Sequence, residues 1–131
     1  MRDAGMRRIP GKGETRRKPG EKKENRMAYL AYVTVPDRER ALAIARTLVE
    51  TRLAAGVNVL PGATSVYRWR GEIRETGECL LFAQVSREAF PCFCETVRRH
   101  HCHEVPCIVA LPLQAGHTPF VRWIEENSLP G

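Results

Sequence analysis

Two long β-rich runs joined at one glycine constrain the fold of this chain more than any other feature. The runs cover residues 57–70 and 72–85 on either side of Gly71, so they are predicted to pair as a β-hairpin. Each run is about twice as long as the usual strand of about 5–6 residues. Pro61-Gly62 interrupts the first run, which predicts a bulge or a bend at that point.

The segment before the hairpin predicts a strand followed by a helix. Residues 28–35 form a short continuous apolar run, which is typical of a strand covered on both faces. Asp37 suits the N-cap of the helix that follows, because its carboxylate can accept from the free backbone N–H groups of the first turn. Gly56 stands where a glycine at the C-terminal end of this helix is expected.

The segment after the hairpin predicts a helix, a strand and a short terminal helix, over residues 87–101, 107–113 and 117–127. Pro91 falls in the first turn of the second helix, where a missing backbone N–H does little harm. The resulting order is β-α-β-β-α-β with one helix added. That order predicts an α+β fold of the ferredoxin-like kind, with both main helices on one face of an antiparallel sheet.

Apolar side chains occupy both arms of the hairpin beyond what two helices of ordinary length can cover. A single sheet also leaves edge strands unpaired, which favours aggregation unless another chain covers them. We therefore predict a closed oligomer in which each hairpin docks on a neighbouring chain. The alternative is a hairpin that folds back on its own chain. The apolar side chains concerned are Leu60, Val66, Tyr67, Trp69, Ile73, Leu81 and Phe82.

The basic charge is confined to the beginning of the chain. Residues 1–26 hold ten of the 21 lysines and arginines but only four of the 15 acidic residues, which accounts for the whole net charge of +6. This segment has almost nothing to bury, so we expect a disordered basic tail over residues 1–26 and a folded domain over residues 27–131. Weak contact of the tail with nucleic acid or a membrane is the less favoured interpretation.

No stretch of the sequence resembles a membrane span or a secretory signal. The tail has no apolar core, and no run reaches the roughly 18 apolar residues that a bilayer requires. The five cysteines are odd in number and favour free thiols in a reducing compartment. These features predict a cytoplasmic protein with no membrane partner.

No motif for nucleophilic, phosphate-binding or metalloprotease chemistry is present, so the chain is expected to be non-enzymatic. The one dense polar cluster is His100-His101-Cys102-His103-Glu104, followed by Pro106-Cys107. Imidazole and thiolate are ligands that copper and zinc prefer, and the carboxylate adds an oxygen donor. The alternative is structural, because histidines also stabilise the C-terminal end of a helix.

The remaining thiols and aromatic residues have simpler interpretations. Cys94 on a helix and Cys79 on a strand are expected to be small buried apolar residues rather than ligands. Tyr67 and Trp69 are two positions apart on a strand and therefore share a face, where packing at an interface is more common than stacking on a ligand.

Several of these segments together resemble the CutA family of divalent-cation tolerance proteins. The resemblance covers nearly all of residues 28–127 and implies a ferredoxin-like fold, a homotrimer held by long hairpins, and a link to copper and other divalent cations. It also implies an architecture similar to the PII signalling proteins, without an established catalytic activity. The segments that carry it are Thr34-Val35-Pro36-Asp37, residues 52–58, residues 61–69, residues 101–106 and Ile108-Val109-Ala110-Leu111-Pro112.

The sequence departs from the family at positions linked to metal binding. Some members have cysteines, proposed as copper ligands, where this chain has Val33 and Gly56. The family pattern His-Pro-Tyr-Glu-x-Pro-Glu is replaced here by residues 101–107, which lose a tyrosine and a glutamate and gain two thiols and a histidine.

Two functions follow from the residues and the resemblance. The first is binding of copper or another divalent metal by His101, Cys102 and His103, assisted by Glu104. The second is a PII-like signalling module that binds a small ligand or a protein partner in clefts between subunits. Tyr67, Trp69 and Glu104 are then expected to line the cleft.

Overall fold

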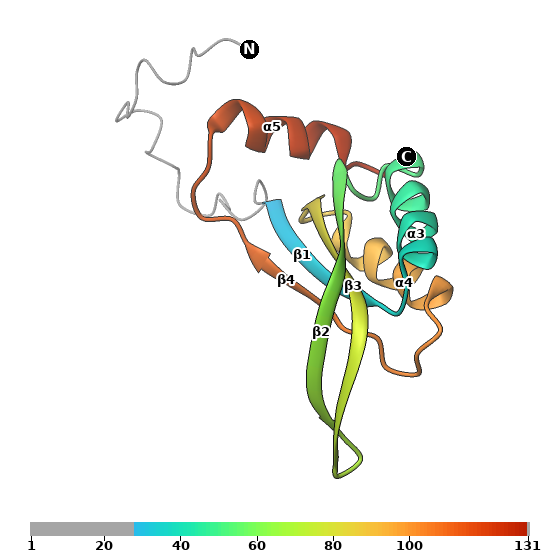
Figure 1. Ribbon diagram of the computed structural model, residues 1–131. Helices are drawn as coiled ribbons and strands as arrows, with labels where there is room; N and C mark the ends of the chain where they lie inside the picture. Colours follow the sequence, from blue (N-terminus) through green and yellow to red (C-terminus); the bar gives the residue numbers. More distant parts are fainter. Residues whose placement is uncertain (1–27, 131) are drawn as a thin grey trace.

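The computed structural model describes residues 28–130, so the prediction for the tail over residues 1–26 lies outside the described residues. A four-stranded antiparallel sheet has the order β2-β3-β1-β4, with α3 and α4 on one face, and this confirms the predicted ferredoxin-like α+β arrangement (Figure 1). The elements are β1 (Ala28–Val35), α3 (Arg38–Glu50), β2 (Gly56–Trp69), β3 (Glu72–Ser86), α4 (Phe90–His100), β4 (Ile108–Pro112) and α5 (Thr118–Asn127).

The main core lies between the sheet and the two helices α3 and α4. Alternate residues of β1 and β3 point toward the helices, and Val33 pairs with Leu81 in the sheet. Leu48 of α3 and Phe93 of α4 meet them from the other side and are fully buried. The amphipathic spacing predicted for both helices therefore places their apolar faces on this side of the sheet.

The second face of the sheet differs from the prediction. Residues 28–35 were expected to be covered on both faces, but in the single chain only one face of β1 is covered by α3 and α4. The other face carries an apolar surface that we name the open face. Its members alternate with the core residues along four strands, and they are Leu30, Tyr32, Leu60, Leu80, Phe82, Val109 and Leu111.

The open face is accessible to solvent in the single chain. Leu111 is 64% exposed, Val109 54% and Leu60 44%. Monomeric proteins seldom expose an extended apolar surface, so this face is a candidate interaction surface. The helices of one chain cover only one side of the sheet. The apolar residues on the other side of β1 therefore have no layer packed over them.

The β2–β3 hairpin extends well beyond the other elements (Figure 1). Its two-residue turn has Arg70 at φ 51° and Gly71 at φ 80°, and this pair of positive φ values is typical of the type I′ turn that matches strand twist. The pairing shifts between Leu60 and Ala63, and Gly62 has φ 92°. The bulge predicted at Pro61-Gly62 is confirmed.

The end of α3 corrects the prediction for Gly56, which begins β2 instead of capping the helix. Arg52 has φ 62° and takes the left-handed position, while Leu53 N donates to Leu48 O at 2.9 Å. An arginine tolerates this conformation because its guanidinium Nη2 donates to Glu126 O at 3.0 Å at the end of α5. This side-chain hydrogen bond offsets the cost of a left-handed backbone, which a glycine would adopt without that cost.

Helix α5 is fixed at the end of the sheet by a buried polar cluster. Ser86 N donates to Ser128 Oγ at 2.8 Å, and Ser128 Oγ donates to Leu53 O at 3.0 Å. Ser86 Oγ also accepts from Ala89 N at 3.0 Å, at the start of α4. Since these groups are buried and all paired, they hold the ends of α3, α4, α5 and β3 together.

Candidate functional site

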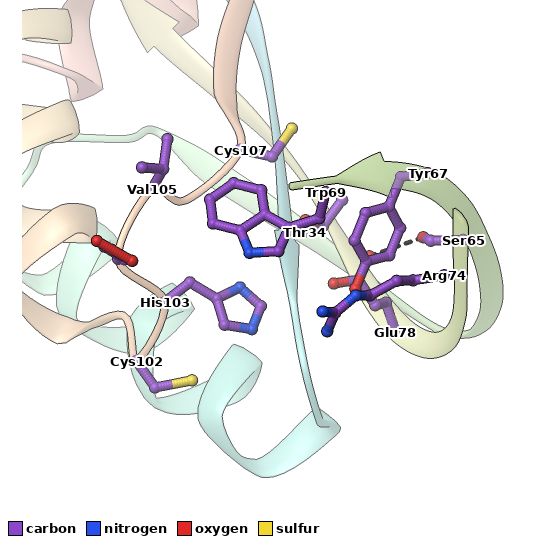
Figure 2. A pocket seen from close by; sticks show the side chains of 11 residues that line it. Thr34, Ser65, Tyr67, Trp69, Arg74, Glu78, Cys102, His103, Val105 and Cys107 are labelled. Carbon is purple, nitrogen blue, oxygen red and sulfur yellow. Dashed lines mark hydrogen bonds between the residues drawn. The ribbon is translucent and has the colours of Figure 1, made fainter. Parts of the chain in front are cut away.

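A cavity of about 570 Å³ lies between the hairpin and the loop over residues 101–107, and we name it the hairpin–loop cavity (Figure 2). Both strands of the hairpin and the end of β1 border it. Its volume is in the range of pockets that take small molecules. The lining residues are Thr34, Ser65, Tyr67, Trp69, Arg74, Glu78, Cys102, His103, Glu104, Val105 and Cys107.

His101 is held at the edge of the cavity by both of its ring nitrogens. Nε2 lies 2.7 Å from Thr34 O, and Nδ1 accepts from His103 N at 3.1 Å. A carbonyl oxygen only accepts, so Nε2 carries the proton and Nδ1 presents a lone pair. Metal-binding histidines commonly have one nitrogen that donates to a carbonyl, as Nε2 does here, but the lone pair of Nδ1 is occupied by the His103 N–H.

The other predicted ligands lie close by but do not converge into a closed site. The rings of His101 and His103 are 4.8 Å apart between centroids, and His103 points into the cavity (Figure 2). Cys102 and Cys107 border the cavity as free thiols. Among residues 28–130, no group of three or more His, Cys, Asp or Glu side chains is arranged to hold a metal ion. The single chain therefore supplies a pair of imidazoles with two free thiols in the same loop.

Glu104 connects the loop to the tip of the hairpin. Its Oε1 accepts from Arg70 Nη2 at 3.1 Å, and the guanidinium of Arg70 lies 5.3 Å from the ring centroid of Trp69. Both side chains of the ion pair are about two-thirds exposed, so the pair itself contributes at most about 1 kcal/mol. The ion pair mainly sets the position of the loop, which it holds against the hairpin strand that carries Trp69.

The structure brings both predicted residue sets to one cavity. Tyr67, Trp69 and Glu104, predicted to line a cleft, border the same space as Cys102 and His103. Only His101 of the predicted ligands lies outside the lining residues.

Sequence reasoning missed several lining side chains of the hairpin, above all Arg74 and Glu78. The turn could have revealed Arg74 as a lining residue. A two-residue turn at Arg70-Gly71 pairs Tyr67 with Arg74 and so places both side chains on one face.

The remaining cysteines and family positions lie away from this cavity. Cys79 is buried as predicted, while Cys94 is only partly buried. Burial raises the pKa of both thiols, which keeps them protonated and disfavours metal binding. Val33 is fully buried against the helices, and a Cβ at Gly56 would lie 2.7 Å from Gln84 Oε1 on the other face. These two positions share no site within one chain.

Comparison with known proteins identifies the family. The family described as CutA1 divalent ion tolerance protein matches residues 29–127. The chain is 46% identical over 102 residues to the divalent-cation tolerance protein CutA of Thermus thermophilus, which covers 78% of this chain and 99% of that protein.

The chain belongs to the CutA1 family. Its fold agrees with solved CutA1 structures. The Thermus thermophilus protein gives a TM-score of 0.76 at 46% identity over 78% of this chain and 99% of that one. The Oryza sativa protein gives 0.77 at 30% identity over 82% and 98%. The chain also matches the human protein CutA with 40% identity, over 73% of this chain but 54% of that one, so it spans about half of the human relative.

Membership of the CutA1 family supports a role connected with divalent-cation tolerance. Helices long and apolar enough to cross a bilayer do not occur between residues 28 and 130. The Thermus thermophilus relative is named for divalent-cation tolerance.

Proposed function

We propose that this chain forms a non-enzymatic homotrimer that binds a divalent metal, with copper as the leading candidate. The observation that carries the proposal is the loop over residues 101–107, which brings the rings of His101 and His103 to 4.8 Å between centroids and holds the free thiol of Cys102 between them in the chain. Nδ1 of His101 accepts from His103 N at 3.1 Å, so a metal bound at this nitrogen takes the place of that hydrogen bond. Membership of a divalent ion tolerance family supports the same conclusion.

The proposed ligands are His101, Cys102 and His103, with Glu104 as an oxygen donor or as a partner of an imidazole. Two imidazoles and a thiol suit copper and zinc, so the donor chemistry fits the proposed metal. Within one chain these groups are not gathered around a single point. The remaining donors are brought in by movement of the exposed loop or by a neighbouring chain in the trimer.

The proposed trimer is supported by the open face and by the edges of the sheet. Strands β2 and β4 are the outer strands of the order β2-β3-β1-β4, and each leaves one row of backbone groups unpaired in the single chain. When the open faces of three copies pack against one another, their apolar side chains are covered. No partner of another kind is then needed to cover them. We propose the cytoplasm as the compartment, since free thiols suit a reducing environment.

Calorimetric titration of copper under anaerobic conditions tests the metal proposal. The unmodified chain is expected to bind copper, and the His101→Ala, Cys102→Ser, His103→Ala variant is expected to lose at least about a hundredfold in affinity. A matched control carries Cys92→Ser and His117→Ala, the same residue types outside the loop. Equal affinity in the loop variant and the control contradicts the ligand assignment.

A second candidate function is favoured by the hairpin–loop cavity. Tyr67, Trp69 and Glu104 were expected to line a cleft between subunits for a small ligand or a protein partner, and in the single chain all three border one cavity of about 570 Å³. We propose PII-like signalling as this second function, with the cavity as its small-molecule site. Variants of the hairpin residues separate this role from metal binding, which depends on the loop.

A further inference from the structure

We propose that the hairpin–loop cavity binds a small organic cation, an amine attached to an apolar or aromatic body, with the Glu78 carboxylate as its ionic partner. The inference rests on the second candidate function above and names the class of ligand. It depends on which charged groups of the cavity already have a partner of opposite charge and which one does not.

The charged side chains around the cavity form ion pairs with one exception. Glu104 Oε1 accepts from Arg70 Nη2 at 3.1 Å, and Arg74 Nη2 lies 3.5 Å from Glu72 Oε1. The remaining carboxylate of the cavity, that of Glu78, has no cationic partner within residues 28–130. Two guanidiniums are therefore balanced against three carboxylates, and the uncompensated charge of the cavity is negative.

Glu78 keeps most of its capacity to accept hydrogen bonds. It is half-buried on β3, and its carboxylate has a single partner in the described part of the chain, the hydroxyl of Ser65, which donates to Oε1 at 2.7 Å. An ionised carboxylate offers about four acceptor sites, so it can bind the several N–H groups of an ammonium. Such hydrogen bonds between charged groups are about twice as strong as neutral ones, and this favours a cation over a neutral ligand.

An aromatic ring lies next to this carboxylate. Ser65 and Tyr67 are two positions apart on β2 and share a face, which places the Tyr67 ring beside the Ser65–Glu78 hydrogen bond (Figure 2). No cation and no second ring contacts Tyr67 within residues 28–130. The face of a tyrosine ring attracts a cation within about 6 Å of its centroid. Trp69 follows on the same face and offers an apolar wall for the body of the ligand.

Arg74 determines which part of the cavity suits the cation. It pairs with Tyr67 near the turn of the hairpin, whereas the Ser65–Glu78 hydrogen bond lies farther from the turn. Because like charges repel, the ammonium is expected on the Glu78 side of Tyr67. The ion pair of Arg74 with Glu72 reduces the repulsion that remains.

Calorimetry with two probes of closely similar shape, 2-naphthylmethylammonium and 2-naphthalenemethanol, tests the inference on the whole chain. At one ionic strength the ammonium is expected to bind at least about tenfold more tightly than the alcohol. The chain has two tryptophans, so the Trp123→Phe variant leaves Trp69 as the only indole. Its indole N–H resonance is expected to shift on addition of the ammonium, which places the probe in the cavity.

Substitution at Glu78 assigns the preference to one carboxylate. Glu78→Gln keeps an acceptor for the Ser65 hydroxyl but removes the charge, and it is expected to abolish the roughly tenfold preference. Glu75→Gln is the matched control, because it removes the same charge from the same strand, and Glu75 pairs with Val66 on the opposite face of the hairpin. The control is expected to keep the preference.

Arg74→Gln provides a second test that does not remove a proposed contact. Loss of this positive charge is expected to tighten binding of the ammonium by about twofold or more, because it removes a repulsion. Weaker binding of the ammonium by this variant contradicts the inference.

The remaining outcomes separate the inference from the function on which it rests. Equal binding of both probes, or equal effects of Glu78→Gln and Glu75→Gln, overturns the inference and leaves a cavity that takes small ligands without selecting a cation. Failure of both probes to bind or to shift the Trp69 resonance removes the small-molecule role as well.

Discussion

Replacing Leu111 by glutamate is expected to dissociate the proposed trimer into folded single chains. Leu111 lies on the outer strand β4, is 64% exposed in the single chain and pairs with Leu30 on the open face. The carboxylate is therefore tolerated in the monomer but becomes an unpaired charge inside the assembly. Burial of an unpaired charge costs several kcal/mol, and the change enters a trimer three times.

Light scattering during size-exclusion chromatography measures this effect, with circular dichroism to confirm that the chain stays folded. Val49→Glu is the matched control, because Val49 is an exposed apolar residue of α3 on the helix side of the molecule. The control is expected to keep the assembly. A Leu111→Glu variant of unchanged mass would remove the open face from the interface.

Phe93→Ala is expected to produce the largest loss of stability among single substitutions in the core. Phe93 is fully buried on α4, packs against the sheet and stacks on Phe90 with ring centroids 5.7 Å apart. Truncation removes the buried ring and leaves a cavity, which typically costs about 3–5 kcal/mol. Denaturant unfolding at one fixed protein concentration measures the change, because association also contributes to apparent stability.

Phe120→Ala serves as the comparison, since Phe120 is 48% exposed on α5 and stacks on Trp123. Its truncation is expected to cost less than half as much. Equal losses at the two positions would indicate that α5 is buried in the assembly to the same degree as the core.

The sequence predicted the order of the elements and most of their bounds because the periodic patterns were long. It was wrong about Gly56, since the conformation that ends α3 was taken by Arg52 at φ 62°. That choice depends on a hydrogen bond to Glu126 O in a helix 74 residues away in the chain, which no local pattern reveals. The half-buried outer face of β1 likewise depends on which side of the sheet the helices cover, which strand propensity does not reveal.

The candidate site was predicted as two residue sets that share Glu104, and all of these residues except His101 line one cavity. Residues 101–107 form an irregular loop, and irregular segments carry no periodicity from which their position can be derived. The contribution of Arg74 was within reach, because a two-residue turn fixes its pairing with Tyr67. What the sequence could not supply was the Arg70–Glu104 contact that brings the loop to the hairpin.

Sedimentation equilibrium of the whole chain tests the central claim most directly, because the proposal is that copies of the same chain cover the apolar open face and the projecting hairpin. The chain has a mass of 14.8 kDa, so the account predicts a single species of about 44 kDa that persists on dilution. A folded species that remains at the mass of one chain across the concentration range would contradict it.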